Sequence, residues 1–252
     1  MPLPTISTPT YELTLPSSER KIKFRPFLVK EEKILILAME SQDSKQIATA
    51  VKDVLKKCIL TRGTKVEKLS TFDIEYLFLN IRGKSVGEDI EVMVTCPDDK
   101  KTQVPMSIHI DDIKVHKEKD HERDIKLDDT YTLRMKYPSL DEFIKNNFGA
   151  VENMNVDDTF DLISSCVDQV FSEEESWASE DCSKKELNDF IESLNSVQFK
   201  KVEKFFETMP KLTHTVKVIN PNTKVESEIT IEGLQNLFAK VWHMKILCHT
   251  IS

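Results

Sequence analysis

The sequence predicts an α+β fold with an N-terminal β-hairpin and helices, a central small antiparallel sheet, and C-terminal helices with a β-hairpin. Three observations lead to this prediction. The apolar residues change along the chain from period two to helical spacing, back to period two, and then to helical spacing again. Turn-forming residues separate the alternating segments. The 252 residues are 39% hydrophobic, which is enough to build a core without disulfides or metals.

The chain opens with an extended arm and a β-hairpin. Five of the 10 prolines lie in the first 26 residues, and proline is excluded from a helix interior. Tyr11–Leu15 and Lys21–Arg25 both alternate with period two, and Pro16-Ser-Ser-Glu19 supplies the turn between them. Residues 1–10 carry few apolar groups, so we expect them to be poorly ordered in the isolated protein and to add to a partner as a strand.

Three helices are expected to follow and to complete a first region, residues 1–88. The first runs from about Lys30 to Met39. The apolar stripe of the second is formed by Ile47, Val51, Val54 and Cys58. The third runs from Thr71 to Arg82, with Gly83 expected as its C-cap and Gly87 at the entry to the next strand.

The middle region, residues 89–137, is expected to form the small antiparallel sheet. Alternating apolar residues predict strands at 90–94, 104–110 and 131–135, each with one buried face. The segment Lys114–Lys126 mixes bases and acids, which is typical of a solvated loop or an edge.

The last region, residues 138–252, returns to helical spacing. The predicted elements are helices at 140–148, 160–171, Lys184–Leu194 and Val197–Thr208, a hairpin of Thr213–Ile219 and Val225–Ile231, and an apolar helix from about Glu232. Between the second and third of these helices, Ser172–Cys182 carries five carboxylates without a base. This acidic segment is the best candidate for a linker.

Charge and cysteine content exclude several classes of protein. A net charge of -8 and a pI ≈ 5.4 argue against nucleic acid as the main partner, because phosphate binding depends on Lys and Arg. The 5 cysteines are scattered without a C-x-x-C pair, so we expect a reducing compartment and no disulfide framework. We recognise no signal peptide and no run of about 18 uncharged apolar residues, so we expect a soluble chain made in the cytoplasm, without a membrane span.

One catalytic pattern matches by spacing: Gly83-Lys-Ser85-Val-Gly87 is a G-x-S-x-G. In a hydrolase elbow a strand precedes the serine and a helix follows it, whereas the predicted order here is the reverse. The overlapping Gly-Lys-Ser lacks the earlier glycine of a P-loop, because Phe78 stands at that position.

A metal site is also unsupported by spacing. His109, His116 and His121 lie close in the sequence with Cys96 upstream, but their spacing matches no familiar ligand framework. Cys96 is expected to be a buried residue at a strand end. The sequence therefore predicts no catalytic, cofactor-binding or metal-binding residue, and no enzyme.

The candidate functional residues are side chains that could contact another protein. Phe205 and Phe206 are adjacent in a helix and point about 100° apart, so either one faces a partner or a wide apolar stripe buries both. Phe24 and Phe27, which flank Arg25-Pro26, pose a similar question at the exit of the first hairpin, and Arg25 and Phe27 are the interface candidates there. Trp177 in the acidic segment is either packed on its own domain or held out as an interface anchor.

The C-terminal helix gives two further interface candidates, Trp242 and Leu247. Chain ends are usually polar and frayed unless another group binds them. We expect Leu234–Val241 to pack against its own domain and Trp242–Cys248 to be completed by a neighbouring chain.

Several segments resemble one family. They are Lys23–Lys33, Leu37–Ser41, Asp73–Glu88 and Phe205–Pro210. They look like segments of the base plate protein family of T-even-type contractile-tailed phages. The resemblance covers most of the chain and is strongest over residues 20–96. It implies a structural or assembly role in the tail baseplate and transfers no catalytic residues.

The function implied is that of a phage baseplate hub component or hub-assembly factor, acting by protein–protein binding on other baseplate or tail proteins. A homo-oligomer is compatible with this role. The protein would lie in the host cytoplasm during assembly and in the tail baseplate if it is retained. Two alternatives remain: a transient tail-assembly chaperone and, from a different class, a serine hydrolase using Ser85.

Overall fold

The computed structural model describes residues 6–41, 43–139 and 156–232, and these ranges confirm the predicted α+β class. The helices are α1 (Val29–Glu40), α2 (Ser44–Cys58), α3 (Thr71–Val86), α5 (Val156–Ser165), α6 (Lys184–Glu192) and α7 (Ser196–Glu207). The strands are β1 (Tyr11–Thr14), β2 (Lys21–Phe24), β3 (Asp89–Thr95), β4 (Gln103–His109), β5 (Lys114–His116), β6 (Asp124–Lys126), β7 (Thr132–Met135), β8 (Val167–Phe171), β9 (Ser176–Ala178), β10 (Lys211–Ile219) and β11 (Glu226–Glu232).

A first core lies between the β1–β2 hairpin and helices α1, α2 and α3, which confirms the hairpin and the three helices predicted for this region. Leu13 pairs with Ile22 and Tyr11 with Phe24, so the inner face of the hairpin is apolar. Because each strand alternates, the lysines of β2 face away from this core.

Helix α3 is buried on nearly all sides and joins the first core to a second one. Leu77 and Ile81 pack in the first core, and Leu79 packs in the second. The helix is one turn longer than predicted: it continues through Gly83 to Val86, and its C-cap is Gly87, which has φ 122°. The expected cap at Gly83 is therefore wrong. Gly83 instead allows a close approach, because a Cβ there would lie 2.4 Å from Cδ1 of Ile110.

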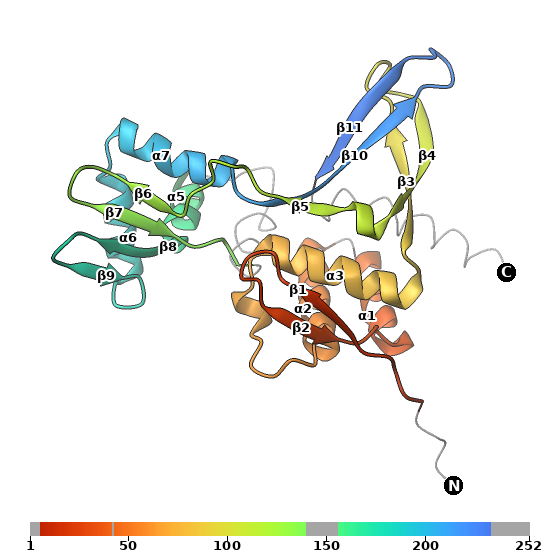
Figure 1. Ribbon diagram of the computed structural model, residues 1–252, viewed down its shortest axis with the longest axis horizontal. Coiled ribbons are helices and arrows are strands. Elements are labelled where there is room, and N and C mark those ends of the chain that lie inside the picture. Colours follow the sequence, from red (N-terminus) through yellow and green to blue (C-terminus); the bar gives the residue numbers. More distant parts are fainter. Residues whose placement is uncertain (1–5, 42, 140–155, 233–252) are drawn as a thin grey trace, which may run out of the picture.

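The second core lies between two hairpins, β3–β4 and β10–β11, which extend together from the body in Figure 1. Their tips are joined: Nδ2 of Asn220 donates to both carboxylate oxygens of Asp98 at 3.0 Å, and the Thr223 hydroxyl donates to the same carboxylate. Nδ2 of Asn222 donates to Oγ1 of Thr102 at 3.0 Å. The two hairpins therefore form one arm that is cross-linked at its end.

Three hairpin turns share one sequence pattern, with proline second and a residue of positive φ fifth. They are Leu15–Glu19, Cys96–Lys100 and Asn220–Lys224. In each turn, the N–H of the fifth residue donates to the carbonyl of the first at 2.9 Å. The φ values of Glu19, Lys100 and Lys224 are 54°, 54° and 64°, in the left-handed region that favours glycine.

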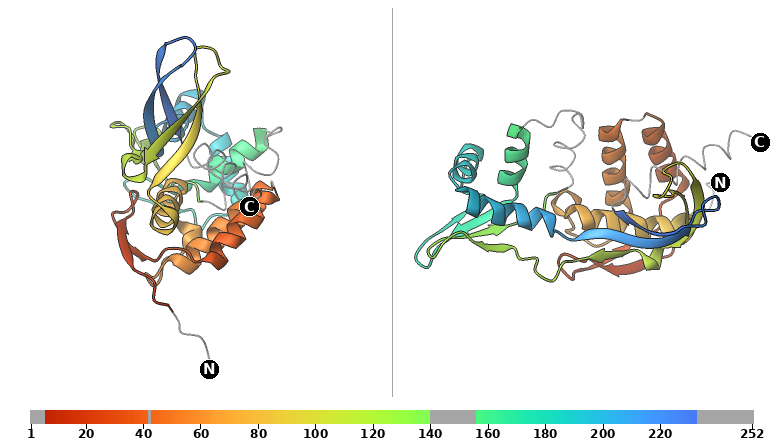
Figure 2. Two further views of the ribbon diagram at one scale, coloured as in Figure 1. Left: turned by 90° about the vertical axis from the view of Figure 1, so that its right-hand side faces the viewer. Right: turned by 90° about the horizontal axis from the view of Figure 1, so that it is seen from above.

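The third core lies between the antiparallel sheet β6-β7-β8-β9 and helices α5, α6 and α7. Figure 2 shows, in the view from above, that α1, α2 and α5 project from one side of the molecule while this sheet and the β10–β11 hairpin run along the other. The predicted helix over 160–171 is wrong in its second half, because α5 ends at Ser165 and Val167–Phe171 form β8.

A β-bulge explains that error. Met135 pairs with Val167 and Arg134 with Gln169, so Asp168 is an extra residue in β8. The extra residue shifts the alternation, and Val167 and Val170 both face the core although they are three positions apart. A spacing of three is the spacing expected of a helix.

The acidic segment Ser172–Cys182 is not a linker. It begins with the turn of the β8–β9 hairpin, in which Val170 pairs with Trp177. The strands predicted for the middle region also do not form one sheet: β3 and β4 form the arm, β5 pairs with β10, and β6 and β7 pair with β8. The mixed-charge segment 114–126, expected as a loop or edge, contributes edge strands β5 and β6.

The first and third cores meet at the start of α3. The N–H of Thr71 donates to the carbonyl of Pro138 at 3.2 Å, and the rings of Phe72 and Tyr137 meet edge to face at 4.9 Å between centroids. The region boundaries at 88 and 137 stay a prediction. The predicted helix at 140–148 and the C-terminal helix lie outside the described residues.

Candidate protein-binding surfaces

Ser85 lies inside α3 and is held by backbone groups. Its hydroxyl donates to the carbonyl of Ile81 at 2.5 Å and accepts from the N–H of Phe27 at 2.9 Å. The strand–turn–helix context of a hydrolase elbow is replaced by continuous helix. These bonds fix the segment before α1 against α3, which is a structural task.

The imidazole rings of His109, His116 and His121 contact different residues among those that the structure describes. Nδ1 of His109 lies 2.9 Å from Oδ1 of Asp89, and Nε2 of His116 lies 3.6 Å from Oε1 of Glu118. Cys96 is buried at the end of β3, as predicted. Over the ranges that the structure describes, no three His, Cys, Asp or Glu side chains are grouped to hold a metal ion.

His121 is buried in an aromatic cluster with Tyr137 and Phe205. Thr208 donates its hydroxyl hydrogen to the Lys204 carbonyl, so it accepts from Nδ1 of His121 at 2.9 Å. Nε2 is then the acceptor for the Tyr137 hydroxyl at 3.0 Å. Burial, followed by the charges of Lys117 and Arg123, lowers the pKa of His121, so the neutral ring is favoured.

Both phenylalanines of α7 pack in the third core. Phe205 is 2% exposed, and Phe206 is partly buried against the same cluster, with the two rings edge to face at 5.1 Å. The wide apolar stripe is therefore the arrangement that the structure shows, and neither ring forms an exposed patch.

Arg25 and Phe27 also make contacts within the protein's own fold. Phe27 is buried in the first core. The Arg25 side chain is 16% exposed, and its guanidinium lies 3.3 Å from both carboxylate oxygens of the fully buried Glu31. The N–H of Leu28 donates to the same carboxylate at 2.6 Å. Burial alone would raise the pKa of Glu31, but the bonds from Arg25 and Leu28 outweigh it and lower the pKa.

Among the predicted interface residues that the structure describes, Trp177 lies on the surface. It is 41% exposed on edge strand β9, and its ring centroid lies 6.2 Å from that of Tyr131, which is also 41% exposed. Trp177 pairs with Val170, and Val170 with Leu133, so its side chain is on the core face of the sheet. Trp177 therefore lies on the core-facing side of the sheet but outside the third core itself, with the Tyr131 ring beside it.

Carboxylates surround this aromatic pair. The pairing of Thr132 with Phe171 places the β6–β7 and β8–β9 turns at the same end of the sheet. These turns carry the exposed Asp128, Asp129, Glu173, Glu174 and Glu175, and among the described residues none of the five makes an ion pair. Backbone N–H groups of Tyr131 and Thr130 lower the pKa of Asp128. We call the two rings and five carboxylates the acidic aromatic edge.

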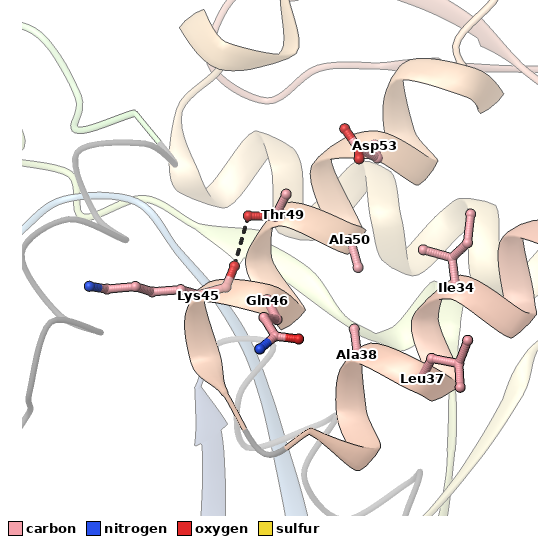
Figure 3. A pocket seen from close by; sticks show the side chains of 8 residues that line it. All are labelled: Ile34, Leu37, Ala38, Lys45, Gln46, Thr49, Ala50 and Asp53. Carbon is pink, nitrogen blue, oxygen red and sulfur yellow. Dashed lines mark hydrogen bonds between the residues drawn. The ribbon is translucent and has the colours of Figure 1, made fainter.

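A second surface is the groove between α1 and α2, with a volume of about 440 Å³ (Figure 3). Its lining side chains are Ile34, Leu37, Ala38, Lys45, Gln46, Thr49, Ala50 and Asp53. Ala38 and Ala50 leave space between the helices, and Leu37 is 55% exposed at the side of the groove. This surface is apolar in the middle and polar along α2.

The sequence reasoning missed Tyr131 and Leu37 as surface residues. Tyr131 begins an alternating apolar run, which predicts burial, but its side chain is 41% exposed in the structure. Leu37 had a signal: residues 34–39 are six consecutive apolar residues in a predicted helix. Such a run covers all helix faces, so one face stays exposed unless a second layer covers it. The other predicted candidates, Trp242 and Leu247, lie outside the described residues.

Comparison with known proteins gives one match. The model of the T4 bacteriophage base plate protein family matches residues 8–239, a range that includes all three cores. No curated protein and no solved structure matches the chain. Within the described ranges, no helix combines the length and apolar character needed to cross a bilayer.

Proposed function

Because the chain belongs to the T4 bacteriophage base plate protein family, we propose that it is a component of the baseplate hub and acts by binding other tail proteins. The match over residues 8–239 is the observation that carries this proposal. The baseplate role follows from the family. The placement in the hub, and a passage through the host cytoplasm during assembly, are part of the proposal.

The acidic aromatic edge is the surface proposed to bind. Tryptophan and tyrosine are enriched among the residues that dominate binding energy, because each buries a large rigid area. Here the ring of Tyr131, just before β7, lies 6.2 Å from that of Trp177 on β9, and the outer side of β9 has no partner strand among the described residues. Such an edge can contribute backbone bonds as well as side-chain contacts.

Purified tails provide the test. If the protein is a hub component, quantitative mass spectrometry finds it in finished tails in a fixed ratio to other tail proteins. A transient assembly chaperone, the second candidate, would be present in infected cells and absent from finished tails. Absence from tails at every stage of purification would overturn the proposal.

A substitution links the surface to this role. Trp177→Ala with Tyr131→Ala is expected to leave the fold intact, since both rings are partly exposed, and to reduce incorporation at least 30-fold, the loss expected from about 2 kcal/mol at a binding hot spot. Val197→Ala is the matched control, because Val197 is an exposed apolar residue on α7. Equal incorporation of the double variant and the control would contradict a role for this surface.

A further inference from the structure

The parts of the chain that hold the first and third cores, which we call lobes, differ in charge. Residues 1–88, which hold the first core, carry 15 Lys and Arg against 11 Asp and Glu. Residues 117–209, which hold the third core, carry 12 against 23. One lobe is therefore basic and another strongly acidic, although the whole chain is moderately acidic at -8.

The basic lobe presents a surface of its own beside β2. The segment after α2 runs along this strand: the N–H of Leu60 donates to the carbonyl of Lys23 at 2.8 Å, and Phe24 bridges to Ile59. Lys23 therefore lies opposite Leu60, on the face directed away from the core. Leu60 is 46% exposed.

Cations gather around Leu60. Nη2 of Arg20 donates to the Arg62 carbonyl at 3.4 Å, which places the two arginines together at the turn of the β1–β2 hairpin. Among the described residues, Arg20, Lys23 and Arg62 make no ion pair, and Lys21 has an exposed one with Glu12 at 3.4 Å. We call Arg20, Lys21, Lys23 and Arg62 with Leu60 the basic edge.

The two edges are complementary in charge and in form. The acidic aromatic edge has two exposed rings and five unpaired carboxylates, and the basic edge has an exposed leucine among four cations, of which three are unpaired. Eight of these nine charges are unpaired, so Lys21–Glu12 is the one ion pair among the described residues of these two edges that the contact could disturb. Oppositely charged patches of this kind steer association and fix its register.

The edges cannot meet within one molecule. Figure 1 shows β9 at the end of the molecule that holds the third core and β2 beside the first core, and the view from above in Figure 2 also separates the β8–β9 hairpin from the β1–β2 hairpin. Contact between them requires two copies.

We propose that the acidic aromatic edge of one copy binds the basic edge of a second copy, head to tail. This inference rests on the proposed binding role of the acidic aromatic edge and names its partner. A head-to-tail contact uses a different surface on each copy, so it forms a closed ring if the rotation between copies closes and an open chain if it does not. Since the edges are small and charged, the association is expected to be weak and sensitive to salt.

Sedimentation velocity of the full-length protein over a concentration series tests this. The sedimentation coefficient of the wild type is expected to rise with concentration at about 0.1 M salt and to lose this dependence near 1 M, where the Debye length falls from about 10 to 3 Å. A wild type that stays monomeric over the whole series overturns the proposal.

Charge reversal identifies the surfaces. Arg20→Glu with Arg62→Glu, and separately Glu173→Lys with Glu174→Lys, are each expected to abolish association. An equimolar mixture of the two variants is expected to associate again, because each provides the edge that the other has lost. Lys33→Glu with Lys114→Glu, exposed residues outside both edges, is the matched control and is expected to associate as the wild type does. Failure of the mixture to associate overturns the pairing of these two edges.

The result is separable from the hub assignment. A monomeric protein that is found in finished tails overturns the self-association alone. A protein that associates through these edges but is absent from tails overturns the hub assignment alone.

Discussion

Removing the guanidinium of Arg25 is expected to destabilise the first core strongly. Glu31 has no exposed side-chain surface, and its carboxylate accepts hydrogen bonds from Arg25 and from the N–H of Leu28. Arg25→Met leaves that carboxylate buried with the Leu28 bond, the distant charge of Lys30 at 3.9 Å, and no charge-assisted hydrogen bond.

The size of the effect follows from burial. Breaking a buried ion pair by removing one partner costs about 3–5 kcal/mol, because an uncompensated charge remains. The Arg25 side chain is 16% exposed, so water can reach part of the vacated space, and we expect the lower end, about 3 kcal/mol. Glu31→Gln should cost less, about 1–2 kcal/mol, because it leaves a partly exposed cation, which can still bond to the amide oxygen, instead of a fully buried anion.

Urea unfolding at pH 7, followed by circular dichroism, measures these differences as shifts of the midpoint at constant slope. The double variant Arg25→Met, Glu31→Met should lie within about 1 kcal/mol of the wild type, because apolar residues of similar volume can replace a buried pair. The folded-state pKa of Glu31 is lowered, so the pair stabilises the protein above about pH 4.3 and this contribution is lost as the pH falls. The loss in free energy of unfolding caused by Arg25→Met should therefore become smaller over the same fall in pH.

The reasoning is refuted if Arg25→Met loses less than about 1 kcal/mol or if the double variant is no more stable than the single one. A stable Arg25→Met protein that fails to enter tails would identify Arg25 as an interface residue instead.

Three further predictions concern the third core, the arm and α3. The unfolding free energy should fall as the pH drops from about 7 to 5, because the lowered pKa of His121 disfavours its protonation in the folded state. In pH-dependent urea melts, His121→Gln should flatten this fall, and His109→Gln should steepen it, because bonding to Asp89 raises the pKa of His109. Lys224→Gly should raise stability by about 0.5 kcal/mol in urea unfolding, since glycine removes the steric cost of φ 64° at the expense of chain entropy. Gly83→Ala should lower the free energy of unfolding in urea by about 1 kcal/mol, because the new Cβ overpacks against Cδ1 of Ile110. Adding Ile110→Val removes that Cδ1 and should restore most of the loss.

Elements with a complete local signal could be predicted from the sequence. The β1–β2 and β10–β11 hairpins have alternating strands and proline-containing turns. Helices α6 and α7 are preceded by the N-cap residues Ser183 and Asn195, whose side chains accept backbone N–H bonds in capping boxes. These signals depend on neighbours in the sequence, so no tertiary information was needed.

Elements that depend on distant partners could not be predicted. β5 has three residues, and it is a strand because Leu212 in β10 pairs with Val115, about a hundred positions earlier in the chain. The identity of β8 depends on the bulge at Asp168, and the helical role of Gly83 depends on the side chain of Ile110. In each case the deciding contact is outside the local sequence window.

The candidate surface was predictable in part. Trp177 attracts attention as a large ring among carboxylates, and the structure places it on the surface. Its neighbour Tyr131 is recognisable only once the register β7–β8–β9 is known, because Tyr131 directly precedes β7, Trp177 lies in β9, and β8 lies between these strands. The aromatic residues at 205 and 206 had an equally strong sequence signal and lie in the third core.

A photo-crosslinking amino acid at position 177 would test the central claim most directly. With the substituted protein expressed during infection, irradiation of purified tails is predicted to join this chain to a baseplate protein or to a second copy. The same amino acid at the exposed position 197 should give no such product. Tails that contain neither the crosslinked product nor the chain itself would contradict the account.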